Sequence, residues 1–101
     1  MYRLNINKAA VPYRFEVVIA NVRYQWEIRY NDMFDFFTVD LSTGGEVLVV
    51  GEPLVYGSSL FQSMGDERFP RFTITPLDQS GIVETVTWGT LQETVFLEVE
   101  P

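Results

Sequence analysis

The sequence predicts an all-β fold: a single small antiparallel β-sandwich or barrel of about seven short strands. Three observations support this. Apolar and polar side chains alternate with a period of two in several segments, clusters of turn-forming residues separate those segments, and no long segment shows the period of a helix. A chain of 101 residues suits one domain, so we expect a single β domain over residues 1–101.

The first two strands are expected over residues 13–19 and 22–30, where every second residue is apolar. The dipeptide Ala20-Asn21 between them suits a two-residue hairpin turn, because asparagine tolerates positive φ. Counting from this turn fixes the register and places Arg14 opposite Glu27 on the polar face. On the apolar face the expected pairs are Ile19 with Val22, Val17 with Tyr24, Phe15 with Trp26, and Tyr13 with Ile28.

Two further strands are expected before the middle of the chain. Residues 34–41 alternate, with Phe37, Val39 and Leu41 on one face, and a turn follows at 42–45. Residues 46–50 are apolar on both faces after the initial glutamate, so this strand is either central in its sheet or covered by something else. We expect Gly51-Glu52-Pro53 to end it and residues 54–57 to return briefly to strand.

The second half of the chain is less regular. A loop or a single helical turn is expected at about residues 58–70, followed by strands over 71–75, 82–88 and 94–99. The turn between the first two of these strands spans residues 76–81. In the last strand, alternation places Val95, Leu97 and Val99 on a core-facing side.

Composition narrows the possible functions. The chain has no histidine and no cysteine, which removes the side chain most used for proton transfer near neutral pH, thiolate chemistry and the commonest metal ligands. The net charge of −7 disfavours specific nucleic-acid binding, which depends on lysine and arginine. The longest apolar run, residues 47–50, is far too short to span a membrane. We therefore expect no cofactor and no metal site.

Residues that could carry catalysis are few. Lys8 has no serine at the spacing of a serine–lysine motif, and a solvated charge explains it better. Paired carboxylates could hydrolyse glycosides, yet with 14 acidic residues such pairs arise without function. Asp32 and Asp35 suit a turn, and Asp66-Glu67 lacks the pattern of a calcium loop. We predict that the chain is not an enzyme.

Aromatic residues divide into two groups. Tyr24, Trp26 and Tyr30 follow the strict alternation and are expected in the core. A second group lies in turns, in the loop or on the polar face of a strand, which indicates either a surface that another chain covers or a second small cluster beneath a folded loop. These candidate interface residues are Phe34, Phe36, Phe61, Phe69 and Phe96.

Beyond these patterns, the order of the segments resembles a known family. The strand at 13–19 leads by a tight turn into Tyr24-Gln25-Trp26-Glu27-Ile28-Arg29-Tyr30-Asn31, and Phe36-Phe37-Thr38-Val39-Asp40-Leu41 follows. Then come Gly45-Glu46-Val47-Leu48-Val49-Val50-Gly51 and Pro53-Leu54-Val55-Tyr56-Gly57-Ser58-Ser59-Leu60. A Thr-x-x-x-Gly-Thr element spans Thr85 to Thr90. In these features the chain resembles the bacteriophage baseplate plug family of contractile-tailed phages, with phenylalanine at position 36 where the family prefers tryptophan.

The resemblance implies a structural role in the virion, without catalytic residues. A plug of this kind would be synthesised in the host cytoplasm and assemble at the centre of the tail baseplate, in contact with hub, spike and tail-tube proteins, and copies would follow the symmetry of the tail. Two other classes of function stay open. One is a ligand- or carbohydrate-binding β module that uses Trp26 or Trp88, and the other is a small hydrolase that uses carboxylates.

Overall fold

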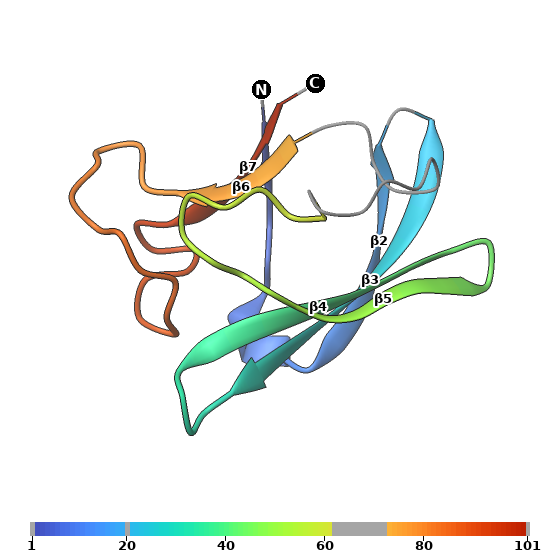
Figure 1. Cartoon of the computed structure of the whole chain (residues 1–101), viewed down its shortest axis with the longest axis horizontal. Coiled ribbons are helices and arrows are strands. Elements are labelled where there is room, and N and C mark those ends of the chain that lie inside the picture. The colour runs from blue at the N-terminus through green and yellow to red at the C-terminus, as the bar shows by residue number, and fades with distance from the viewer. Residues whose placement is uncertain (1, 20, 62–72, 101) are drawn as a thin grey trace.

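Two antiparallel sheets face each other across an apolar core in the computed structural model of the chain (Figure 1). The structure describes residues 2–19, 21–61 and 73–100. Within these residues there is no α-helix, and the only helical element is the short 3₁₀ turn η1 (Lys8–Ala10). The sandwich form of the predicted all-β fold is confirmed, and the sheets do not close into a barrel.

The larger sheet has four strands in the order β2-β3-β4-β5. Its first hairpin joins β2 (Tyr13–Ile19) to β3 (Val22–Asn31) in the predicted register, with Phe15 opposite Trp26. Asn21 adopts the expected left-handed conformation, with φ of 66°. Arg14 meets Glu27 across the strands, where its Nε donates to Oε1 at 2.5 Å. Counting from a two-residue turn was therefore sufficient to pair these strands.

The second hairpin of this sheet joins β4 (Phe36–Thr43) to β5 (Glu46–Pro53). Phe37, Val39 and Leu41 are fully buried, as predicted. Strand β5 lies at the edge of the sheet, so of the two alternatives for this strand the central position is wrong, and covering by something else stays a prediction. The expected end at residue 50 was also wrong, because the strand continues through Gly51 to Pro53. The pairing of β4 with β5 changes register on both sides of Leu41, as at a β-bulge. Near this irregularity the carboxylate of Asp40 accepts the N–H of Gly51 at 2.8 Å.

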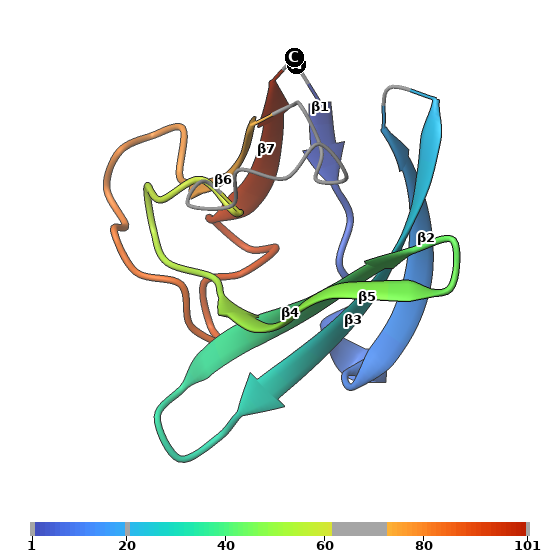
Figure 2. The same ribbon diagram turned by 45° about the vertical axis from the view of Figure 1, so that its right-hand side comes forward.

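The smaller sheet has the order β1-β7-β6 and packs over the first (Figure 2). Its strands are β1 (Tyr2–Leu4), β7 (Phe96–Glu100) and β6 (Thr73–Leu77). The outer edge of β6 is covered, because Pro76 and Ile74 accept backbone hydrogen bonds from Gly57 and Leu60 at 2.9 and 2.8 Å. The segment that follows β5 thus connects the two sheets.

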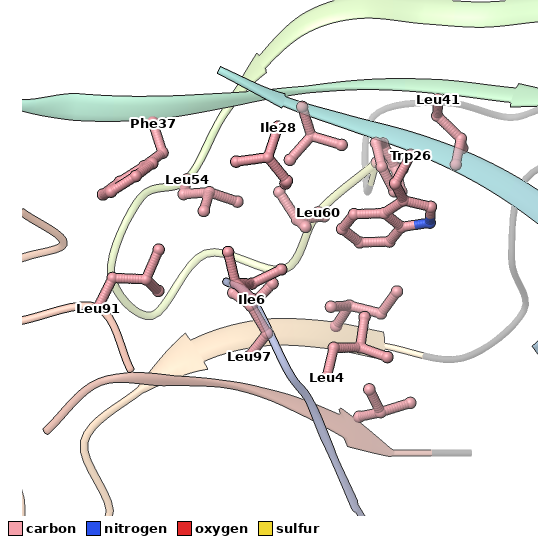
Figure 3. Close-up of a cluster of buried hydrophobic side chains, with 14 of the residues drawn as sticks. Leu4, Ile6, Trp26, Ile28, Phe37, Leu41, Leu54, Leu60, Leu91 and Leu97 are labelled. Atoms are coloured by element: carbon pink, nitrogen blue, oxygen red, sulfur yellow. The ribbon is translucent and has the colours of Figure 1, made fainter. Parts of the chain in front are cut away.

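The core lies between the sheets and draws on both (Figure 3). Trp26 and Ile28 of β3 and Phe37 of β4 project from one side, and Leu97 of β7 projects from the other. Leu54 and Leu60 enter from the segment after β5. As predicted, Val95, Leu97 and Val99 are fully buried. The alternation in the sequence therefore identified the core side of each of these strands.

Several element predictions need correction. Residues 82–88, expected as a strand, are not a strand: residues 82–87 have no regular secondary structure and Trp88 lies in a turn, and residues 54–57 do not return to strand. The strand expected at 71–75 corresponds to β6, described over Thr73–Leu77, so the turn expected at 76–81 begins later; residues 71–72 lie outside the described residues. Strand β1 was missed, although Leu4 and Ile6 alternate with polar residues and both are buried. Of the loop or helical turn expected at 58–70, residues 58–61 form a loop that ends in a turn at 60–61, and residues 62–70 lie outside the described residues.

Candidate functional site

The acidic side chains do not converge on a catalytic or metal-binding arrangement in the part of the chain that the structure describes. No group of three potential metal ligands occurs there. Glu16 pairs with Arg23 at 3.2 Å and Asp40 with Arg29 at 3.2 Å, so these two strand carboxylates hold arginines. Asp66-Glu67 lies outside the described residues. No described helix is long and apolar enough to cross a bilayer.

The turn between β3 and β4 carries two adjacent exposed apolar side chains. Met33 and Phe34 occupy this turn, and 80% and 71% of their surfaces are accessible. The turn projects from the lower end of the molecule, away from the smaller sheet (Figure 2). Two adjacent large apolar side chains at a projecting tip are typical of a surface that another molecule covers.

Local hydrogen bonds shape this turn. The Oδ1 of Asn31 accepts the backbone N–H groups of Met33 and Phe34 at 3.0 and 3.2 Å. Asp35 adopts a left-handed conformation with φ of 54°, which reverses the chain into β4. Asparagine and aspartate provide this geometry because short polar side chains can bond to nearby backbone groups. The tip is therefore held in one shape by its own sequence.

A second set of hydrogen bonds ties the turn to a distant loop. One oxygen of Asp35, Oδ1, accepts the hydroxyl of Tyr30 at 2.6 Å and the backbone N–H of Trp88 at 2.9 Å. The bond from Trp88 and then that from Tyr30 lower the pKa of the Asp35 carboxyl. The same carboxylate, followed by desolvation, raises the pKa of Tyr30 to about 12. At neutral pH, therefore, an ionised Asp35 joins two neutral donors.

Aromatic packing completes the support beneath the tip. The ring of Tyr30 lies 4.9 Å from the ring centroids of both Phe37 and Trp88. Trp88 stacks on Phe37 at 5.9 Å with an interplanar angle of 14°. The ammonium of Lys8 lies 5.6 Å from the centroid of the Trp88 ring and donates to the Trp88 carbonyl at 2.6 Å. Lys8, predicted as a solvated charge, thus helps to fix this loop.

The structure distributes the candidate interface aromatics unevenly. Phe34 is exposed at the tip, and Phe36 is half-buried and lines, with Met33, a shallow hollow of about 420 Å³. Phe96 is half-buried on the smaller sheet beneath the guanidinium of Arg3. Phe61 is not a surface residue, because it is buried against Trp26 with the rings 6.0 Å apart; of the two alternatives for this residue, burial beneath the loop is the one that the structure supports. Phe69 lies outside the described residues.

Sequence reasoning missed Met33 and the supporting role of Trp88. Met33 could have been found, since it directly precedes Phe34 in a turn that is otherwise polar. The contact between Trp88 and Asp35 could not, because 53 residues separate them in the chain. Of the two tryptophans considered for sugar binding, Trp26 is fully buried and cannot serve. Trp88 is partly exposed, but Tyr30, Phe37 and Lys8 already contact its ring.

Comparison with known proteins adds one finding. A family model described as "Cyanophage baseplate Pam3 plug gp18" matches residues 1–101, the full length of the chain. A search of curated proteins found no match.

Proposed function

Because the chain belongs to the cyanophage baseplate plug family and is a structural component of a phage tail baseplate, we propose that it fills the centre of the baseplate by docking on hub, spike and tail-tube proteins. The match over residues 1–101 is the observation that carries this proposal. In the proposal the chain acts as one β domain without enzymatic activity, is synthesised in the host cytoplasm and works in the virion.

The tip formed by Met33 and Phe34 is the proposed contact with these neighbouring proteins, and Phe36 extends it along β4. Exposed side chains of this size gain stability when a partner buries them, about 1.5–3 kcal/mol for each large side chain. Because Asn31 and Asp35 hold the turn in advance, little conformational entropy is lost on docking. Phe96 on the other sheet is proposed as a smaller part of the contact surface.

The acidic character of the chain fits a place beside a DNA conduit. A net charge of −7 repels phosphates, so the genome would not adhere to the plug. In the proposal, therefore, the partners are proteins only, with neither a specific nucleic acid nor a membrane among them. Copies are expected to follow the symmetry of the tail.

A complementation experiment tests the proposed docking tip. Phage lacking the plug would be grown in cells that supply wild-type protein, the Phe34→Asp variant or the Ile82→Asp variant. Phe34→Asp should fold normally, because the side chain is exposed, but should be missing from purified tails and should not restore plaques. Ile82, which is also exposed but lies on a different loop, provides the matched control, and its variant should assemble.

Two results would contradict the docking tip. Tails that contain Phe34→Asp at the wild-type level would show that the tip makes no essential contact. Loss of assembly in both variants would show that any new charge on an exposed apolar residue is harmful, and that Phe34 has no special role.

A glycan-array screen of the purified chain tests the alternative of a carbohydrate-binding module, which requires binding that Trp88→Ala abolishes.

A further inference from the structure

Strand β5 lies at the edge of the larger sheet, yet its middle stretch is apolar. Its stretch from Val47 to Val50 contains four consecutive apolar residues and no charge. Even so, 64% of Val47 and 69% of Val50 is accessible. Edge strands in monomeric proteins usually carry charges that prevent further pairing. Glu46 and Glu52 lie towards the two ends of β5, but the stretch from Val47 to Val50 between them carries no such charge, so we expect this stretch to pair with another strand.

The opposite edge of the same sheet is β2, and no strand among the described residues pairs with its outer side. Val18 on this strand is 59% accessible. No described residue outside the sheet forms a hydrogen bond to the backbone of β2 or to that of residues 47–50. The smaller sheet differs, because the segment that contains Gly57 and Leu60 covers the edge of β6.

The topology makes these two edges compatible with each other. The sheet has four strands, and each neighbouring pair is antiparallel, so β2 and β5 run in opposite directions. When β2 of a second copy is placed beside β5, the two strands are antiparallel and the outer faces of both sheets point the same way. The second copy thus continues the sheet without being turned over.

The charges on the two hairpins also favour this order. The β2–β3 hairpin carries Arg14, Arg23 and Arg29 against two glutamates. The β4–β5 hairpin carries three acids and no cation. If β5 of one copy paired with β5 of another, two acidic hairpins would lie side by side and repel each other. If β5 paired with β2 of the other copy, an acidic hairpin would lie beside one with a net positive charge.

We propose that copies of this chain join head to tail, with β5 of one copy paired antiparallel to β2 of the next, and that this pairing closes into a ring. The contact is heterologous, because different surfaces meet, and a heterologous contact that closes gives a ring. This inference deepens the proposed plug function by naming the contact between copies, and it is tested on the purified chain alone.

Light scattering after size-exclusion chromatography would measure the oligomeric state of the wild type and of two edge variants, Val18→Lys and Val50→Lys. Each variant blocks one partner of the joint with an exposed charge. The wild type should form a discrete ring, and each variant alone should be a monomer. Because each variant keeps the edge that the other has lost, an equimolar mixture of the two should form a one-to-one dimer. Val55→Lys, at an exposed position outside the strands, is the matched control and should still form rings.

Amide hydrogen exchange provides a second readout that needs no substitution. In concentrated wild-type protein the outward amides of β2 and β5 should be protected, and dilution to monomer should remove this protection from both strands together. A wild type that is monomeric at every concentration would overturn the proposal. So would a Val18→Lys variant that still dimerises, since that result assigns the joint to β5 alone. If the chain is monomeric but is still found in purified tails, the proposed ring is wrong and the proposed plug function is not contradicted.

Discussion

Trp26 lies at the centre of the core and has contacts on several sides. Its ring centroid is 5.9 Å from that of Phe15 and 6.0 Å from that of Phe61. The indole Nε1 is buried and has no hydrogen-bond partner among the described residues. Within the described residues, the contribution of Trp26 to stability therefore comes from packing.

Replacement of Trp26 by alanine should lower the free energy of unfolding by about 3–5 kcal/mol, the range for a large-to-small change in a core. Denaturant unfolding measures this loss. The same experiment on Phe61→Ala and on the double variant should show a coupling of about 0.5–1.5 kcal/mol, because the two rings are in edge contact. A loss below about 1 kcal/mol for Trp26→Ala would contradict the assigned core.

The hydrogen bond from Tyr30 to Asp35 makes a second residue-scale prediction, for alkaline pH. The folded-state pKa of Tyr30 is raised from 10.0 to about 12. Since the neutral hydroxyl is favoured in the folded state, the associated stability is fully present below pH 10 and is lost as the pH rises towards 12.

Denaturant unfolding at a series of pH values would check this expectation. The wild type should lose more stability than Tyr30→Phe across this pH window, because the phenylalanine variant has no hydroxyl to ionise. Ultraviolet titration follows the ionisation of the tyrosine hydroxyls. Near pH 12 the wild type should ionise one more tyrosine than the Tyr30→Phe variant. Ionisation of Tyr30 near its ordinary pKa would show that the bond to Asp35 does not persist in solution.

At the scale of elements, the first hairpin was predictable because its information is local. Alternation over residues 13–19 and 22–30 gives the faces, and the two-residue turn gives the register. The salt bridge from Arg14 to Glu27, together with the bond from Arg29, lowers the pKa of the Glu27 carboxyl. These exposed pairs reinforce a register that the turn has already fixed.

The turn itself can be tested at Asn21. Its left-handed φ of 66° is strained for residues with a Cβ and an apolar side chain. Asn21→Ala should therefore lower the free energy of unfolding by about 1–2 kcal/mol, measured by denaturant unfolding. Asn21→Gly is the control and should retain the wild-type stability within about 0.5 kcal/mol. Equal losses in both variants would show that the asparagine side chain, and not its backbone conformation, is what matters.

The Thr-x-x-x-Gly-Thr element also has a local explanation. The hydroxyl of Thr90 donates to the carbonyl of Thr85 at 2.9 Å and accepts the N–H of Thr87 at 2.8 Å. These bonds curl residues 85–90 into a tight loop and present the backbone N–H of Trp88 to Asp35. The sequence pattern was visible, but its partner in the β3–β4 turn was not.

At the scale of the whole molecule, the shared apolar core holds the two sheets together, and polar contacts fix loops and strands at its margins. Asp78, which is mostly buried, accepts hydrogen bonds from Ser80 and from the N–H of Val83, and these bonds lower the pKa of its carboxyl. On the smaller sheet, Glu98 is buried and pairs with Arg3 at 3.0 Å, which fixes β1 against β7. The bonds of Asp78 are local in the sequence, whereas the pair of Arg3 and Glu98 joins residues that only the fold brings together.

The sequence by itself determined the all-β class, the register of the first hairpin and the inward faces of β3, β4 and β7, because a period of two and a tight turn are local properties. It also carried the family resemblance. Only the tertiary structure decided that Phe61 is buried, that β5 is an edge strand and that Trp88 supports the tip at Phe34. Burial and strand order depend on which distant segments pack together, and an apolar residue is equally compatible with a core and with a surface that a partner covers.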